Sequence, residues 1–132
     1  MREDSKRCTL GPESQYADFA AEVFSLLSDA TRVRIILALR EGELPVGELA
    51  ELVGKSPTVV SQHLAKLRWG KIVRARQEGT RVFYSLIGEH ARQLVSHAVF
   101  QAEHVVDAIP PHHRAGGAGG AAPSGADDEG ER

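Results

Sequence analysis

The feature that most constrains the fold of this chain is a change of hydrophobic period in its middle. Before residue 71 and after residue 88, apolar residues recur at helical spacing. Between these segments, KIVRARQEGTRVFYSL alternates apolar and polar residues on both sides of Glu78 and Gly79. This alternation predicts a β-hairpin with a glycine-containing turn. We therefore expect a mainly α-helical fold that carries one hairpin.

The predicted helices begin and end at residues suited to those positions. Asp29 and Ser56 are expected to cap two of the helices, because their side chains can accept hydrogen bonds from free N–H groups of the first turn. Pro57 fits the first helical position after Ser56. The predicted helical segments, with their capping and closing residues, are 16–28, 29–42, 45–54, 56–70 and 89–109.

Composition limits the class of protein. The chain has 132 residues, which suits one domain, and only 5% aromatic residues, which favours an aliphatic core. It contains no apolar run long enough to span a membrane and no secretory signal, and its single Cys8 excludes an intrachain disulfide. We expect a cytoplasmic protein with a flexible arm at 1–13, a folded domain at 14–109 and a disordered, Gly/Ala-rich tail at 110–132.

The charges are unevenly distributed along the chain. The net charge is −2, yet eight Lys and Arg residues lie between Lys55 and Arg92, against only Glu78 and Glu89. The tail carries the acidic run DDEGE. Because the local field rather than the net charge attracts phosphate groups, the middle of the chain remains a candidate DNA-binding region.

The order of two short helices, a tight turn and a basic hairpin is typical of a winged helix-turn-helix. In the second helix, Val60, Leu64 and Leu67 share one face and are expected to face the core. The opposite face carries short polar side chains suited to base edges and phosphates, although a merely solvated face would look alike. The residues predicted to bind DNA are Ser56, Thr58, Ser61, Gln62, His63 and Lys66 on the helix, and Arg74, Arg76 and Arg81 on the hairpin.

Three stretches, DATRVRIILAL, SQHLAKLR and EGTRVFYSL, resemble the ArsR/SmtB family of small winged-helix repressors over about residues 16–109. The resemblance implies a homodimer with the first and last helices at its interface and the wings over an inverted-repeat operator in double-stranded DNA. It also implies a regulator and not an enzyme. A metallohydrolase is disfavoured independently, because the chain shows no nucleophile elbow or open general base.

The resemblance directs attention to where a regulatory ligand would bind. Thiolate-rich members of the family carry cysteines on the third helix, whereas PVGELAELVG has none. The last helix instead carries His90, His97 and His104, which are spaced by seven residues and therefore share one face. If two such helices crossed antiparallel near residue 97 in a dimer, His90 would face His104 of the partner subunit. His97 would face its own symmetry mate, and we expect it to be an interface residue; a shared third metal or a pH-sensitive contact is the alternative.

The stretch EHARQLVSHAVFQAEHVVDAIPPHHRAGG resembles the nickel- and cobalt-sensing type within this family. Carried over position by position, its metal ligands fall on His90, Glu103, His104, His112 and His113. A set of imidazoles with a carboxylate suits six-coordinate Ni(II) or Co(II) better than tetrahedral Zn(II). Glu103 is turned by about 100° from His104 on the helix, so it is either a direct ligand or a residue that orients one.

Two alternatives within the same fold stay open at this point. Zinc-sensing relatives use the pattern D-x-H…H-x-x-[E/H], of which this chain keeps His90 and His104 but has Gly88 and Gln101 at the other two positions. A zinc sensor would therefore need ligands from the tail. The second alternative is a repressor without a metal response, in which the histidines are incidental.

Overall fold

The computed structural model describes residues 9–109. The predictions about residues 1–8, which include Cys8, and about the tail at 110–132, which include His112 and His113, lie outside this range. The chain divides into two compact units, Met1–Val95 and Ser96–Arg132, and the division falls within the last helix. Within the described range, no helix is both long and apolar enough to cross a membrane.

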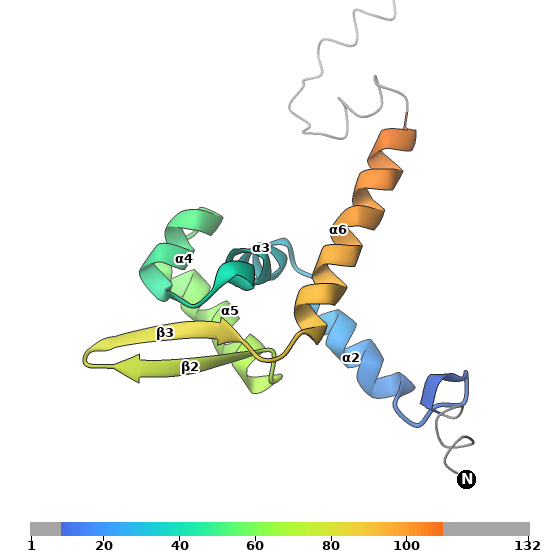
Figure 1. The fold of residues 1–132 in the computed structure, drawn as a ribbon, viewed down its shortest axis with the longest axis horizontal. Coiled ribbons are helices and arrows are strands. Elements are labelled where there is room, and N and C mark those ends of the chain that lie inside the picture. The colour runs from blue at the N-terminus through green and yellow to red at the C-terminus, as the bar shows by residue number, and fades with distance from the viewer. Residues whose placement is uncertain (1–8, 110–132) are drawn as a thin grey trace, which may run out of the picture. The chain divides into compact units, whose positions relative to one another are not determined.

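The structure is mainly helical with a small antiparallel sheet, as the sequence predicts (Figure 1). In chain order the elements are α2 (Ala17–Leu27), α3 (Ala30–Ala38), the 3-10 turn η1 (Leu39–Glu41), β1 (Leu44–Pro45), α4 (Val46–Val53), α5 (Pro57–Trp69), β2 (Val73–Glu78), β3 (Arg81–Leu86) and α6 (His90–Ala108).

The predicted hairpin is confirmed. Strand β2 pairs with β3 in antiparallel register, and the pairing of Glu78 with Arg81 leaves Gly79 and Thr80 as a two-residue loop. Gly79 has a φ of +65°, which glycine adopts without the steric cost that a β-carbon brings. The turn therefore suits this sequence.

The sheet has a third strand that the sequence did not predict. Pro45, which was predicted to open the helical segment 45–54, instead forms β1 with Leu44, and the two residues pair with Phe83 and Tyr84 of β3. The sheet order is β1-β3-β2, so Pro45 lies on an edge strand, where its missing N–H costs no ladder hydrogen bond. Two residues give no alternating pattern, which is why this strand left no sequence signal.

Both predicted helix caps are confirmed. The Asp29 carboxylate accepts a hydrogen bond from the Arg32 backbone N–H over 3.1 Å, and the Ser56 hydroxyl accepts one from the Val59 N–H over 3.2 Å. The helix that Asp29 caps ends earlier than predicted, because α3 tightens into η1 before Gly42. Side-chain caps of this kind typically contribute about 1 kcal/mol each.

The core lies beneath α5, and its predicted apolar face is confirmed. Val60, Leu64 and Leu67 are fully buried. Burying a side chain of this size typically stabilises a fold by about 1.5–3 kcal/mol, so this face holds α5 firmly in place. The other fully or almost fully buried residues of the core are Ile35, Ile36, Leu39, Leu49, Ala50 and Val73, with Ala91 and Val95 from the first turns of α6.

The end of α5 is shaped by close packing against α2. The sequence predicts that the helix closes at Gly70, and Gly70 is the residue that follows its last turn. Its φ is −84°, however, and the positive φ of +65° falls on Lys71. A β-carbon at position 70 would overlap Leu26 Cδ2, so the approach of α2, and not backbone conformation, favours glycine there; a larger residue would have to displace the partly exposed Leu26 side chain.

Candidate nucleic-acid interface and metal ligands

The polar face of α5 is exposed. Thr58, Ser61, Gln62 and Lys66 all lie on the surface, opposite the buried Val60–Leu67 face. Since the packed side of the helix fixes its orientation, these four side chains are held outward on a rigid support. The prediction that they face outward is confirmed, and their contact with DNA stays a prediction.

His63 occupies a different position from the rest of this face. Only 19% of its side chain is exposed, and its Nδ1 accepts a hydrogen bond from Arg32 Nε over 3.0 Å. The carboxylate of Asp29 lies 3.9 Å from the same nitrogen. An Nδ1 that accepts places the proton of the neutral ring on Nε2. His63 therefore contacts α3, and little of its side chain is exposed for a contact with DNA.

Arg32 joins three helices at this point. Besides His63 of α5, its guanidinium donates through NH1 to the Leu26 carbonyl in the last turn of α2, over 3.0 Å. Asp29 caps the same turn of α3 that carries Arg32 and has a lowered pKa, first because the Arg32 N–H donates to it and further because His63 is nearby. The start of α3 therefore positions α5 relative to α2.

The three predicted arginines of the hairpin differ in their surroundings. Arg74 is exposed, and among residues 9–109 no hydrogen-bond or ion-pair partner reaches its guanidinium. Arg81 is also exposed, and its guanidinium carbon lies 5.0 Å from the centre of the Phe83 ring. Arg76, in contrast, is paired with carboxylates. Of these three arginines, Arg74 and Arg81 therefore present cations that no carboxylate neutralises among the described residues.

Arg76 is held by two carboxylates. Its Nε and NH2 donate to Glu43, with a shortest distance of 2.5 Å, and its NH1 donates to Glu78 over 2.9 Å. The hydrogen bond and charge of Arg76 lower the pKa of Glu43, and those of the two carboxylates raise the pKa of Arg76. Glu43 was not predicted as part of this site, because it lies 33 residues from Arg76 in sequence.

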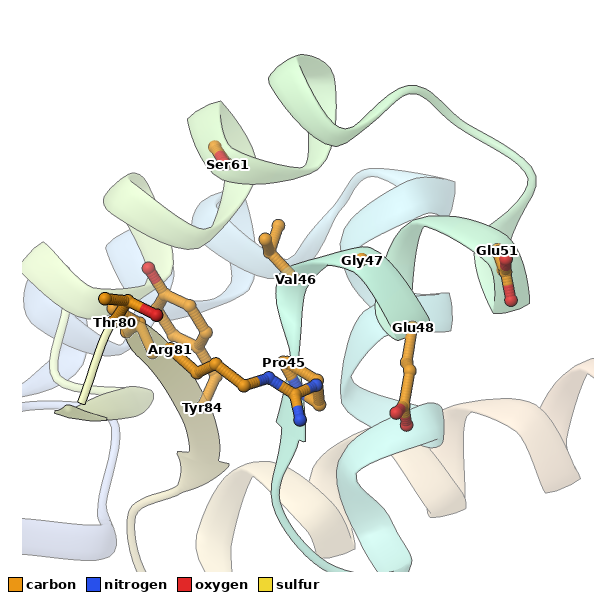
Figure 2. A pocket seen from close by; sticks show the side chains of 10 residues that line it. Pro45, Val46, Gly47, Glu48, Glu51, Ser61, Thr80, Arg81 and Tyr84 are labelled. Atoms are coloured by element: carbon orange, nitrogen blue, oxygen red, sulfur yellow. The ribbon is translucent and has the colours of Figure 1, made fainter. Parts of the chain in front are cut away.

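Two of the predicted DNA contacts lie around one hollow between α5, the start of α4 and the hairpin (Figure 2). The hollow has a volume of about 590 Å³, with Ser61 on its α5 side and Arg81 on its hairpin side. Thr80 and Tyr84 add hydroxyl groups, which no sequence pattern singled out. Glu48 of α4 also lines the hollow, so its charge is mixed.

The predicted metal ligands that the structure describes lie on α6. His90, Glu103 and His104 are all exposed, and none of them has a side-chain partner among the described residues. No group of three or more His, Cys, Asp or Glu residues that could hold a metal ion exists in the described part of one chain. Their donors are accessible, but a complete site needs further ligands from elsewhere.

The first turn of α6, which carries His90, is fastened to the region before the sheet. Arg92 NH2 donates to the Arg40 carbonyl of η1 over 2.7 Å, and Arg92 Nε lies 3.5 Å from Glu89. Farther along α6, the His97 ring packs edge-on against Phe100 with the ring centres 6.1 Å apart. His97 thus sits beside an apolar side chain, as an interface residue would.

The sequence of this chain is similar to those of known regulatory proteins. The model of the arsR family of bacterial regulatory proteins matches residues 29–74, which run from the cap of α3 into β2. HTH-type transcriptional regulator KmtR of Mycobacterium tuberculosis is 54% identical over 106 residues, covering 80% of this chain and 81% of that protein. A cadmium resistance transcriptional regulatory protein CadC homolog of Staphylococcus aureus is 46% identical over 59% of this chain and 65% of its own.

The fold has a counterpart as well. The homodimeric winged helix-turn-helix DNA-binding domain of Mb0332 from Mycobacterium bovis, described as a possible ArsR-family transcriptional regulator, matches with a TM-score of 0.64. The two sequences are 28% identical, and the match covers 76% of this chain and 97% of the other. The predicted winged helix-turn-helix is thereby confirmed, and so is the prediction that the chain resembles regulators and not enzymes.

Proposed function

The chain belongs to the arsR family of bacterial regulatory proteins, and from this premise we propose that it is a metal-responsive repressor. In this proposal a cytoplasmic homodimer binds an inverted-repeat operator in double-stranded DNA. Binding of Ni(II) or Co(II) between the last helices then lowers the affinity for the operator. The observation that carries the proposal is the pairing of a rigid, polar α5 face with exposed imidazoles on α6.

The DNA part of the proposal rests on α5 and the hairpin. Ser56, Thr58, Ser61, Gln62 and Lys66 offer hydroxyl, amide and ammonium groups that pair with base edges and phosphates in a major groove. His63 contributes chiefly by fixing α5 to Arg32. Arg74 and Arg81, which no carboxylate neutralises, are proposed to contact the DNA backbone beside the groove.

The dimer is supported by apolar side chains that one chain leaves exposed. On α2, Phe19 and Phe24 are 63% and 60% exposed, and on α6 Phe100 is 54% exposed. Large apolar side chains in such number on two helices typically mark an interface with another chain. The homodimeric state of the Mb0332 domain supports the choice of a second copy as that partner.

The metal part rests on the chemistry of the donors. His90 and His104 present free imidazoles, and Glu103 a free carboxylate, on one helix. Because the described residues of one chain hold no complete set, we propose that the remaining ligands come from the second copy and from His112 and His113. Ni(II) or Co(II) would supply a six-coordinate cross-link between the two copies there. The cadmium resistance named for the CadC homolog supports a metal as the signal class.

The test is a metal titration followed through DNA binding. A fluorescently labelled inverted-repeat duplex, selected from random sequence by the purified protein, reports binding through its anisotropy at fixed salt. Nickel or cobalt chloride should release the duplex, and a His112→Ala/His113→Ala variant should require more metal. A His97→Ala variant is the matched control. It removes an imidazole from the same helix, but the proposal does not include His97 among the metal ligands.

The outcomes separate the proposal from its alternatives. Release by zinc at lower concentrations than nickel or cobalt would favour a zinc sensor, which the absorption bands of the cobalt form would identify as tetrahedral. Selective duplex binding that no metal changes would leave a metal-independent repressor. Failure to bind any selected duplex would overturn the DNA part itself.

A further inference from the structure

Arg76 was predicted to contact DNA, but its surroundings assign it another task. We infer that Arg76 is a positioning residue for the hairpin, and that Glu43 and Glu78 withhold its charge from DNA phosphates. The consequence is weaker binding to DNA of arbitrary sequence and therefore better discrimination in favour of the operator. This inference rests on the proposed DNA-binding function and adds a determinant of its specificity.

The geometry around Arg76 leaves little of its guanidinium for another anion. Nε donates to both oxygens of the Glu43 carboxylate, at 3.1 and 3.2 Å, and NH2 donates to one of the same oxygens at 2.5 Å. These charge-assisted bonds place the carboxylate against the Nε–NH2 edge of the guanidinium. The NH1 group donates to Glu78. The guanidinium carbon also lies 4.9 Å from the centre of the Phe83 ring. Each of its three nitrogens donates a hydrogen bond to a carboxylate, and one face lies near the ring.

The pairing crosses the whole sheet. Arg76 lies on β2 opposite Phe83 of β3, and Phe83 pairs on its other side with Pro45 of β1. Glu43 lies just before β1, so the contact between Arg76 and Glu43 joins the two outer strands across the middle one. A hairpin joined only at its base would move at its tip. This contact holds β2 to the segment that leads into α4.

The charges favour retention of this contact near DNA. A phosphate that displaced Glu43 would replace one singly charged oxyanion by another of similar geometry, so the exchange gains Arg76 little. It would also leave the Glu43 carboxylate unpaired beside the DNA. With both carboxylates ionised, the cluster of Arg76, Glu43 and Glu78 carries a net charge of −1. This charge repels a phosphate backbone, whereas Arg74 and Arg81 attract it.

The experiment measures the salt dependence of binding to a scrambled 30-bp duplex. The logarithm of the affinity falls with the logarithm of the salt concentration, with a slope of about −0.9 for each phosphate that the protein neutralises. An Arg74→Met variant should lower the steepness of this slope by about 0.9. An Arg76→Met variant should leave the slope unchanged, while amide hydrogen exchange in β2 becomes faster because the hairpin loses its tie to Glu43.

Removing the two carboxylates that hold Arg76 should change the salt dependence in the opposite direction. A Glu43→Gln/Glu78→Gln variant should bind the scrambled duplex about threefold more tightly and with a slope steeper by about 0.9, since Arg76 then reaches a phosphate. Adding Arg76→Met to that variant should remove the steeper slope. A Glu48→Gln/Glu51→Gln variant is the matched control, because it removes two negative charges from α4 without touching Arg76.

Two results would overturn the inference. One is an Arg76→Met slope that falls as much as that of Arg74→Met, which would make Arg76 a phosphate contact. The other is a Glu43→Gln/Glu78→Gln variant that behaves like the α4 control, which would show that the carboxylates do not mask Arg76. Selective binding of the wild type to its own selected duplex is measured first. If the wild type did not bind that duplex selectively, the proposed DNA-binding function would be overturned. If it did, either of the two results above would overturn only the inference about Arg76.

Discussion

Arg32 Nε donates a hydrogen bond to His63 Nδ1 over 3.0 Å, and through it the start of α3 holds the middle of α5. The same guanidinium donates to the Leu26 carbonyl at the end of α2. A residue on the helix proposed to contact DNA is thus tied to α3 and, through Arg32, to α2. His63 therefore fixes the position of α5 more than it contributes to the polar face proposed to contact DNA.

Replacing His63 should therefore affect folding more than the electrostatics of DNA binding. His63→Ala removes a partly buried acceptor for a charged donor and should lower the free energy of unfolding by about 1–2 kcal/mol. His63→Asn, whose side-chain oxygen can replace Nδ1 as the acceptor, should recover part of this loss. Urea unfolding at fixed protein concentration measures both. An Ala variant with wild-type stability and a shallower salt slope would instead identify His63 as a DNA contact.

Acidification should destabilise the fold through Asp29 and Glu43. The pKa of each is lowered in the folded state from ordinary values of 3.8 and 4.5, by the Arg32 N–H and by Arg76 respectively. Their contribution is fully present above those ordinary values and is lost as pH falls through the lower, folded-state values. Asp29→Asn and Glu43→Gln should each flatten the decline of unfolding free energy below about pH 5. Profiles parallel to the wild type would contradict the assignment.

The end of α5 allows a pair of opposite changes. Lys71 adopts a φ of +65°, so Lys71→Gly should raise the free energy of unfolding by up to about 1 kcal/mol. Gly70→Ala should lower it by about 0.5–1.5 kcal/mol, because the new methyl group would force the partly exposed Leu26 side chain out of its rotamer. Thermal and urea unfolding of the two variants measure the difference. If both variants had the free energy of unfolding of the wild type, neither the packing of Gly70 nor the backbone conformation of Lys71 would affect stability.

The metal proposal predicts graded effects along α6. His90→Ala and His104→Ala should each abolish release of DNA by nickel, because each removes an imidazole donor that the site needs. Glu103→Gln should weaken metal binding by about 10–100-fold if Glu103 orients a ligand and does not bind directly. Isothermal titration with nickel chloride measures the loss of metal affinity in each variant. None of the three changes should alter binding to the selected duplex without metal, and a loss there would indicate damage to the dimer.

The elements of this fold could be predicted where their signals are local. The caps at Asp29 and Ser56, the core face of α5 and the hairpin around Gly79 each depend on residues within a few positions of one another. The contacts that organise the surface are not local. Arg32 and His63 lie 31 residues apart, and Arg76 and Glu43 lie 33 apart, so neither pairing leaves a periodic pattern in the chain.

The metal ligands show the same division. The heptad spacing of the histidines on α6 is visible in the sequence, and the exposure of His90 and His104 agrees with it. The wing arginines could be recognised as basic, but their partners could not, because a carboxylate near an arginine in space need not be near it in sequence. The distribution of Lys and Arg along the chain therefore indicated the basic region, but it could not show which of these side chains are paired with carboxylates.

The two-residue strand β1 has a consequence for how such a protein can respond to a signal. Leu44 and Pro45 pair with β3 and lead without a break into α4, so the wing and the helix-turn-helix are joined on both sides. One subunit can then hardly alter the distance between its own helix and wing. In a dimer, what remains adjustable is the separation of two such surfaces. The length of the spacer between operator half-sites, and not the bases within each, would then determine which promoters can be switched.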